Sequence, residues 1–259
     1  MDNLLKTAAL ALDTAWADRD ENLYVAGVLA HRLPAGMDLI VLPELFSTGF
    51  VTDSTVLTGI ADSESHHPSV DAMRAMAADT NAAVCGSIAW MLADGRFVNR
   101  CLFVEPNGET TAYDKHHLFT LGQEAKVFTA GRREPPVVRF RGWNIAMAVC
   151  YDLRFPEWLR NRGARYDLLA LPANWPQARA YAWEHLLIAR AIENQAYVVG
   201  ANRSGSDDNG RYDGLTHIYD YLGMPIDVPA GKEGHAVMAT LSLKALTDAR
   251  RGFPVLQGI

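Results

Sequence analysis

The chain has 259 residues, of which 49% are hydrophobic and 21% are charged, and its formal net charge is −6. This length and composition are typical of a folded globular protein with a sizeable core. The negative net charge argues against the basic surface that proteins use to bind nucleic acid or an anionic membrane, so we expect small-molecule or protein partners.

The sequence also lacks the features of secreted and membrane proteins. Residues 1–6 show no basic stretch followed by an apolar run, so no secretory signal is expected. No apolar run reaches the roughly 20 residues that a membrane-spanning helix needs. The cysteines Cys85, Cys101 and Cys150 are odd in number and have no paired spacing, which argues against disulfides. We therefore predict a cytoplasmic protein with reduced cysteines.

Short apolar runs alternate with amphipathic stretches along the whole chain, which is typical of a layered α/β protein. Apolar residues recur at helical spacing over 21–33, 69–79 and 179–194, where we expect helices. The expected strands are residues 4–12, 38–42, 82–89, 97–104, 145–150, 167–171, 196–201 and 236–241. Asn107-Gly108 between two of the apolar runs predicts a hairpin, and therefore a mixed sheet. No linker divides the chain, so we predict one domain over residues 1–259.

Motifs for metals and cofactors are missing from the sequence. The polar segment 204–210 lacks the ligand spacing of a calcium loop, so we expect a solvated turn there. The pairs His66-His67 and His116-His117 have the wrong spacing for one helix face, and no HExxH or CxxC motif accompanies them. No phosphate-binding loop and no dinucleotide motif occurs either. We therefore predict no metal and no cofactor.

Cys150 is the most informative residue of the chain. It ends the apolar run 145–149, and a helix is expected to follow from Pro156 to Gly163. Strand ends are where α/β folds place their chemistry. Backbone N–H groups and a helix N-terminus at that place would lower the pKa of the thiol and make it nucleophilic. Taken alone, however, a buried cysteine is more often a small core residue.

Other segments offer the groups that a cysteine nucleophile needs, which are a base and a stabiliser of the oxyanion. Glu44 follows a buried strand and Pro43, where partial desolvation would raise its pKa toward the range of a general base. Lys115 lies among aromatic residues and histidines after another strand and could hold an oxyanion. Glu124 could pair with Lys115 or orient water. Each of these residues alone is more often a surface residue, and no histidine has a context that makes it the base.

Together these segments resemble the nitrilase superfamily of carbon–nitrogen hydrolases. The resemblance runs nearly end to end and is carried by Leu-Pro-Glu at 42–44, Tyr-Asp-Lys-His-His-Leu-Phe at 113–119 and Val-Cys-Tyr-Asp-Leu-Arg-Phe-Pro at 149–156. It implies a four-layer αββα sandwich with mixed sheets. It also implies a homodimer in which sheets and helices continue across the interface.

Further segments, at 46–50, 173–176, 189–198 and 202–207, are similar to the ω-amidase branch of this superfamily. This similarity implies hydrolysis of the ω-amide of small α-keto dicarboxylates, such as α-ketoglutaramate and α-ketosuccinamate, through a cysteine acyl-thioester. Leu215 departs from the pattern, because relatives commonly have a polar residue there. That departure puts the fine specificity in doubt and leaves the chemistry intact.

The resemblance also implies a role for each catalytic residue. Glu44 accepts the Cys150 proton, protonates the departing ammonia and then activates the hydrolytic water. Lys115 and the backbone N–H of Tyr151 hold the oxyanion. Glu124 orients water or Lys115.

A keto-acid substrate carries a carboxylate, which calls for an arginine or for exposed backbone donors. The candidates are Arg154, Arg179 and Arg203. Arg154 stands two residues after Asp152, so the stronger expectation for it is an ion pair with acidic residues that braces the turn.

Aromatic residues are the candidates for the walls of the pocket. Phe46, Phe119, Phe128 and Trp175 could exclude water there, although any of them could equally be core. The predicted substrate-binding residues are Tyr151, Phe119, Trp175 and Arg154.

Several alternatives stay open at this point. A deaminated glutathione amidase, an N-carbamoyl amino acid hydrolase or a true nitrilase would keep the same Glu, Lys and Cys. A protein of a different class, a catalytically silent dimeric scaffold, would not need them. Glu134 lies in the same polar stretch as Glu124 and is the alternative for its role.

Overall fold

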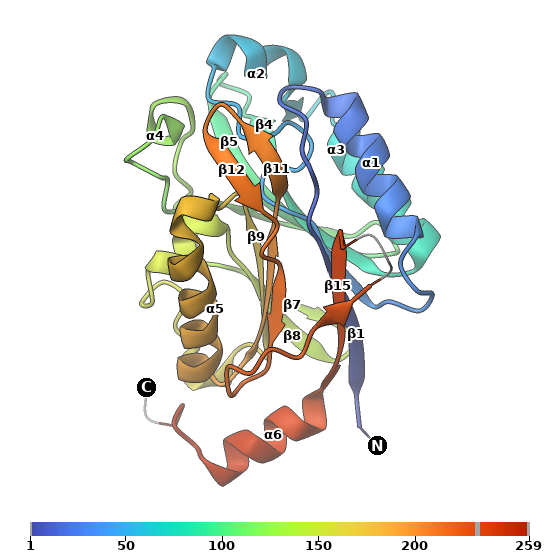
Figure 1. Cartoon of the computed structure of the whole chain (residues 1–259), viewed down its shortest axis with the longest axis vertical. Helices are drawn as coiled ribbons and strands as arrows, with labels where there is room; N and C mark the ends of the chain where they lie inside the picture. Colours follow the sequence, from blue (N-terminus) through green and yellow to red (C-terminus); the bar gives the residue numbers. More distant parts are fainter. Residues whose placement is uncertain (1, 231–233, 258–259) are drawn as a thin grey trace.

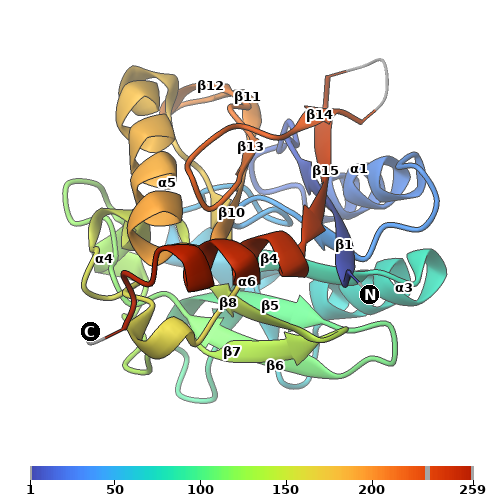
Figure 2. The ribbon, with the colours of Figure 1, turned by 90° about the horizontal axis from the view of Figure 1, so that it is seen from below.

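The computed structural model describes residues 2–230 and 234–257 of the chain. Two β-sheets pack face to face, and helices cover the outer face of each sheet (Figure 1, Figure 2). The layers therefore follow the order helix, sheet, sheet, helix, which is the αββα arrangement expected from the sequence. The apolar cluster between the sheets includes Leu5 and Val41 from one sheet and Ile145 and Leu169 from the other.

The larger sheet is mixed. Its strands are β1 (Leu4–Leu10), β2 (Leu39–Val41), β3 (Asp62–Ser63), β4 (Ala83–Met91), β5 (Phe97–Val104), β6 (Thr110–Asp114), β14 (Val228–Pro229) and β15 (Ala236–Ser242). The order is β14-β15-β1-β2-β4-β5-β6, with β3 beside β4. β1, β2 and β4 run parallel, whereas β15, β5 and β6 are antiparallel to their neighbours. The predicted Asn107-Gly108 hairpin is confirmed, because Gly108 donates to the Glu105 carbonyl at 2.8 Å between β5 and β6.

The second sheet repeats this arrangement with fewer strands. It contains β7 (Val137–Phe140), β8 (Trp143–Met147), β9 (Leu168–Ala173), β10 (Tyr197–Asn202) and β13 (His217–Tyr219). Their order is β13-β10-β9-β8-β7, and the three central strands are parallel. The outer strands β7 and β13 are antiparallel to their neighbours. Each sheet thus has a parallel centre, whose strands end at one edge.

The helices expected over residues 21–33, 69–79 and 179–194 are formed, with ends that differ by at most two residues. The α-helices are α1 (Arg19–His31), α2 (Ser54–Ile60), α3 (Pro68–Thr80), α4 (Glu124–Val127), α5 (Ala180–Asn194) and α6 (Leu243–Gly252). α1 and α3 pack on the larger sheet through Ala26, Ala30 and Met73, and α5 packs on the second sheet through Trp183 and Leu187. No described helix is long and apolar enough to cross a membrane.

The expectation of a solvated turn over residues 204–210 is wrong for most of that segment. Residues 204–207 form β11 (Ser204–Asp207), which pairs with β12 (Gly210–Asp213) in a separate two-stranded sheet. Arg203, before the hairpin, donates to Asp207 at 2.6 Å and lies against the ring of Tyr212. This anchor turns a polar, glycine-rich stretch into an ordered hairpin.

The strand before Cys150 is shorter than expected. β8 ends at Met147, and Cys150 itself opens the 3₁₀ helix η1 (Cys150–Arg154). Cys150 has a φ of 44°, in the left-handed region that a residue with a side chain rarely adopts. Such a conformation persists only where the surrounding contacts fix it.

The helix expected from Pro156 to Gly163 is not formed. Residues 156–159 make turns, and after them the Asn161 side chain bonds both the N–H and the carbonyl of Tyr166 at 3.0 and 2.9 Å, which leads the chain away from a helix. Gly163 has the left-handed φ of 63° that a helix-ending glycine takes. It lies, however, inside the short 3₁₀ turn η2 (Arg162–Ala164). The remaining short element is η3 (Gln177–Arg179), which leads into α5.

Candidate active site

The predicted catalytic residues come together where strands of both sheets end. Glu44 follows β2 and Lys115 follows β6, whereas Cys150 follows β8 and Glu124 begins α4. All of them are buried: Glu44 and Glu124 are 0% exposed, Lys115 is 1% exposed and Cys150 is 8% exposed. The order of motifs in the sequence therefore corresponds to one compact cluster.

Lys115 is the centre of this cluster. Its Nζ donates to Oε1 of Glu44 at 2.8 Å and to both carboxylate oxygens of Glu124 at 2.8 and 2.9 Å. Burial alone would lower the pKa of Lys115, but the negative charges of Glu124 and Glu44 outweigh it and raise that pKa above its usual value. Glu134, the alternative to Glu124, lies elsewhere and pairs with Arg165 at 3.2 Å. Glu124 is thus the second carboxylate on Lys115, and Lys115 is a fixed positive charge.

Glu44 is desolvated, as the sequence predicted. Burial raises its pKa above the ordinary glutamate value, Lys115 acts in the opposite direction, and the charge of Glu124 raises it further. Its carboxylate also lies close enough to the Cys150 side chain for the two groups to shift each other's pKa, and it accepts a hydrogen bond from the backbone N–H of Asn174 at 2.9 Å. The carboxylate that faces the thiol is therefore less acidic than an exposed glutamate.

The expectation that the pKa of the Cys150 thiol is lowered is wrong. Burial raises this pKa well above its ordinary value, and the negative charge of Glu44 raises it further. Lys115 and the N–H of Asn174 act in the other direction without overcoming these effects. Cys150 consequently rests as a thiol, and the neighbouring Glu44 carboxylate is placed to take the proton.

Two asparagines of the cluster were missed from the sequence. The side-chain amide of Asn99, on β5, donates to Glu44 at 2.8 Å and to Glu124 at 3.3 Å. The backbone carbonyl of Asn99 accepts the backbone N–H of Lys115 at 2.9 Å. A polar residue inside the apolar strand β5 was the available signal. Asn174 follows β9 at a strand end, in the same way that Cys150 follows β8.

A cavity of about 310 Å³ opens onto Cys150 and Lys115. All the predicted substrate-binding residues line it, namely Tyr151, Phe119, Trp175 and Arg154. Arg179 lines it as well, and so do Asn209 and Tyr212 from the β11–β12 hairpin. The sequence had not placed this hairpin at the pocket.

The arginines divide into two kinds. The Arg154 guanidinium lies 4.9 Å from the centroid of the Trp175 ring, and that of Arg179 lies 5.1 Å from the centroid of Phe119. Within the described residues neither has an ion-pair partner, so the expected pairing of Arg154 with acidic residues is not found. Arg203 is 0% exposed, forms an ion pair in the hairpin and does not line the cavity.

Phe46 and Phe128, the other residues that the sequence offered as walls of the pocket, belong to apolar core clusters.

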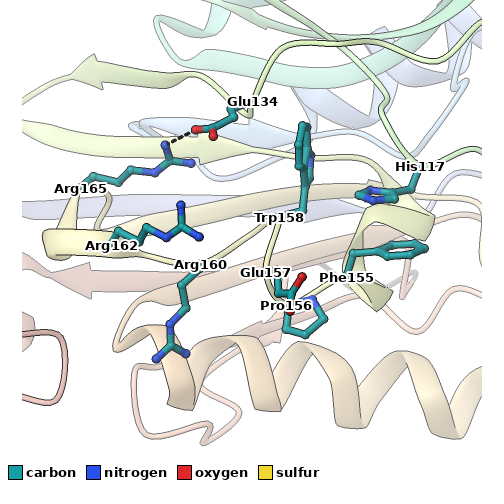
Figure 3. A pocket seen from close by; sticks show the side chains of 9 residues that line it. All are labelled: His117, Glu134, Phe155, Pro156, Glu157, Trp158, Arg160, Arg162 and Arg165. Atoms are coloured by element: carbon teal, nitrogen blue, oxygen red, sulfur yellow. Dashed lines mark hydrogen bonds and ion pairs between the residues drawn. The ribbon is translucent and has the colours of Figure 1, made fainter. Parts of the chain in front are cut away.

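A second cavity, of about 370 Å³, is lined by none of Glu44, Lys115, Glu124 and Cys150, and of the sequence candidates it contains only the alternative, Glu134. Figure 3 shows its arginines, with Arg165 pointing to Glu134, and its aromatic wall of Trp158, Phe155 and His117. His117 Nδ1 lies 2.9 Å from an oxygen of Asp152. Across residues 2–230 and 234–257, no cluster of histidine, cysteine and acidic side chains is suited to a metal ion.

Comparison with known proteins identifies the family of the chain. The family model for carbon–nitrogen hydrolases matches residues 6–251. The chain belongs to the carbon–nitrogen hydrolase family. As a carbon–nitrogen hydrolase it shares the mixed-sheet fold of the nitrilase superfamily, which confirms the resemblance identified in the sequence.

Curated and solved relatives cover almost the whole chain. It is 44% identical to the ω-amidase YafV of Yersinia enterocolitica, over 96% of this chain and 94% of the relative. It is 30% identical to the 2-oxoglutaramate amidase of Bacillus subtilis, over 97% of this chain and 96% of the relative. The crystal structure of XC1258 from Xanthomonas campestris, a CN-hydrolase superfamily protein with an arsenic adduct in its active site, superimposes with a TM-score of 0.90. That protein is 38% identical, and the match covers 99% of this chain and 96% of XC1258.

Proposed function

We propose that this carbon–nitrogen hydrolase is an ω-amidase that converts small α-keto dicarboxylate monoamides, such as 2-oxoglutaramate and 2-oxosuccinamate, to the acid and ammonia. The observation that carries the proposal is the Cys150 thiol beside the buried carboxylate of Glu44, at a cavity lined by two arginines that have no ion-pair partner among the described residues. The similarity to an ω-amidase and to a 2-oxoglutaramate amidase over nearly the whole chain supports the same substrate class.

The first half-reaction forms a thioester and releases ammonia. Glu44 takes the Cys150 proton as the sulfur bonds to the amide carbon, and the carbonyl electron pair moves onto oxygen. Lys115 and the backbone N–H of Tyr151 stabilise this oxyanion. When the intermediate collapses, the carbon–nitrogen bond breaks and Glu44 returns its proton to the leaving nitrogen. Ammonia departs and the acyl group stays on Cys150.

The second half-reaction restores the enzyme. Glu44 takes a proton from water, and the water oxygen attacks the thioester carbon. The carbon–sulfur bond then breaks, the acid leaves, and the Cys150 sulfur recovers the proton from Glu44. Glu124 keeps Lys115 in place through both halves by holding it with two oxygens at 2.8 and 2.9 Å.

Arg154 and Arg179 bind the α-keto acid end of the substrate in this proposal. Both line the cavity and both lie against aromatic rings, Trp175 and Phe119, which hold the guanidinium groups in place without neutralising them. A guanidinium group can bind a carboxylate through two parallel hydrogen bonds. The cavity therefore offers charge for the carboxylate at some distance from the thiol that attacks the amide.

We also propose that the protein acts in the cytoplasm as a homodimer. The dimer is supported by exposed apolar side chains that meet where the turn after β13 packs against α5. These are Ile192, 50% exposed, Leu222, 63% exposed, and Met224, 58% exposed. Sedimentation equilibrium of the wild-type protein tests this part, and a monomer at micromolar concentration would contradict it.

A panel of substrates tests the activity. Ammonia release from 2-oxoglutaramate and 2-oxosuccinamate is compared with release from deaminated glutathione, an N-carbamoyl amino acid and a nitrile. We expect the highest kcat/KM for the two α-keto dicarboxylate monoamides. A higher value for any other member of the panel would assign the protein to that activity, and no turnover of any member would favour the scaffold alternative.

A further inference from the structure

One buried carboxylate joins the segment of the nucleophile to the segment of the lysine. Asp152 is 0% exposed and stands two positions after Cys150. It accepts hydrogen bonds from Tyr113 and His117, which stand two positions before and two positions after Lys115. The residues two positions on either side of the proposed catalytic lysine are therefore tied to the turn that carries the proposed nucleophile.

On the nucleophile side, Asp152 closes a turn around Cys150. Its backbone N–H donates to the Val149 carbonyl at 2.9 Å, and the Val149 N–H donates back to Oδ2 of Asp152 at 3.1 Å. Cys150 lies inside this ring of hydrogen bonds with its left-handed φ of 44°. Since such a backbone conformation needs outside support, the Asp152 carboxylate is one of the groups that hold it.

On the lysine side, the same carboxylate uses both of its oxygens. Tyr113 donates its hydroxyl to Oδ2 at 2.8 Å, while the backbone N–H and Nδ1 of His117 each lie 2.9 Å from Oδ1. Aromatic rings pack against the outer side of this network. Trp158 donates to the Tyr113 hydroxyl at 2.9 Å. The ring of His117 stacks on that of Phe155, with centroids 3.6 Å apart (Figure 3).

We propose that Asp152 is a positioning residue that fixes Cys150 and Lys115 relative to each other. It does not touch the substrate, and it acts through the hydrogen bonds to Val149, Tyr113 and His117. Because donors face both of its oxygens, the site requires a group that only accepts hydrogen bonds, which an ionised carboxylate is and an amide is not. The inference extends the proposed function, since it rests on the roles proposed there for Cys150 and Lys115.

Asp152→Asn tests the proposal with almost no change in volume. One acceptor becomes an NH₂ group that faces other donors, so the two segments should shift apart. A misplacement of reacting groups by about 1 Å costs on the order of 10²-fold in rate. We expect kcat for 2-oxoglutaramate to fall about 10²-fold, with KM unchanged because Arg154 and Arg179 are untouched. Asp248→Asn, an exposed aspartate on α6, is the matched control and should behave like the wild type.

A second readout needs no substrate. The rate at which iodoacetamide alkylates Cys150 is measured across pH, and mass spectrometry confirms the modified residue. If Asp152 sets the geometry of the thiol, Glu44 and Lys115, the pH profile of alkylation should be displaced in Asp152→Asn. Tyr113→Phe removes one donor and keeps the ring, so it should cause a smaller displacement in the same direction.

The outcomes separate a positioning role from a structural one. A folded Asp152→Asn protein with wild-type kcat and a wild-type alkylation profile would overturn the proposal, whether or not its melting temperature falls. If Asp152→Asn does not fold, the profile of Tyr113→Phe decides, and an unchanged profile overturns the proposal. If the wild-type protein does not hydrolyse ω-amides, the proposed function fails, while the alkylation profiles still decide the role of Asp152.

Discussion

Lys115 and Glu44 are joined by a hydrogen bond of 2.8 Å between Nζ and Oε1, and both side chains are almost completely removed from solvent. Glu124 binds the same ammonium group. One positive charge thus lies between two buried carboxylates. The carboxylate beside Cys150, that of Glu44, is a weaker acid than the carboxylate of an exposed glutamate. This relationship would allow Glu44 to act as the proposed base without help from a histidine.

The pH profile of the reaction should reflect the raised pKa of Glu44. Glu44 must be ionised to accept the thiol proton, and burial raises its pKa above the ordinary glutamate value. Activity should therefore be lost, as the pH falls, at a higher pH than an ordinary glutamate would give. Glu44→Gln should lower kcat by about 10²- to 10⁴-fold, the range of general acid–base catalysis. An acid limb of kcat/KM at the ordinary glutamate pKa, or a fully active Glu44→Gln protein, would contradict this role.

The candidate cluster could be predicted from the sequence because Glu44, Lys115 and Cys150 lie in three motifs in a fixed order. Glu44, Lys115 and Cys150 each look ordinary alone, and only their combination pointed to a site. The contacts of Asn99 could not be predicted in the same way, because they join residues 25 and 55 positions apart through the pairing of strands. Nothing in the sequence around Asn99 indicates that Glu44 and Glu124 are its hydrogen-bond partners.

The fold was predicted best where local and tertiary preferences agree. β5 has the expected ends, since an Asn-Gly turn fixes one side and an apolar run defines the rest. The helix expected after Pro156 does not form. The Asn161 side chain instead forms hydrogen bonds with the backbone N–H and carbonyl of Tyr166. The direction of the Cys150 pKa shift also depends on burial and on a charge brought from residue 44, neither of which is local.

Glu124 and Glu134 should respond differently to the same substitution. Glu124→Gln removes the charge that holds Lys115 through two oxygens, so kcat should fall, and the buried ion pair loses a partner at a cost of about 3–5 kcal/mol in stability. Glu134→Gln affects only a pair with Arg165 on the surface and should keep wild-type kcat. Ammonia-release assays and urea unfolding of both variants check this. A fully active Glu124→Gln protein beside an inactive Glu134→Gln protein would reverse the assignment.

The two cavity arginines should control the affinity for the keto-acid end. Arg154→Met or Arg179→Met removes a charge-assisted hydrogen bond, worth about 1.5–3 kcal/mol, so KM for 2-oxoglutaramate should rise about tenfold or more. Arg162→Met, in the second cavity, is the control and should leave KM unchanged. Steady-state kinetics under saturating and limiting substrate separates KM from kcat. Wild-type KM values in both pocket variants would show that backbone donors bind the carboxylate instead.

Gly131 should be needed for the segment that carries Lys115. A Cβ at this position would lie 1.9 Å from the Asp114 carbonyl oxygen, and the Gly131 N–H donates to the Lys115 carbonyl at 2.8 Å. Gly131→Ala should therefore cost about 1–3 kcal/mol in stability and reduce kcat. Gly27→Ala in α1 meets no atom within 4 Å and should stabilise the protein by about 0.5–1 kcal/mol. Calorimetric melting curves compare the two, and the prediction fails if the Gly131→Ala curve coincides with that of the wild type.

Ammonia release by Cys150→Ala is the most direct measurement of the central claim, that this thiol carries the acyl group. The control is Cys101→Ala, which removes a fully buried thiol that does not line the active-site cavity. With both proteins shown to be folded by circular dichroism, the account predicts no turnover of 2-oxoglutaramate by Cys150→Ala and retained turnover by Cys101→Ala. Retained turnover by Cys150→Ala would contradict it.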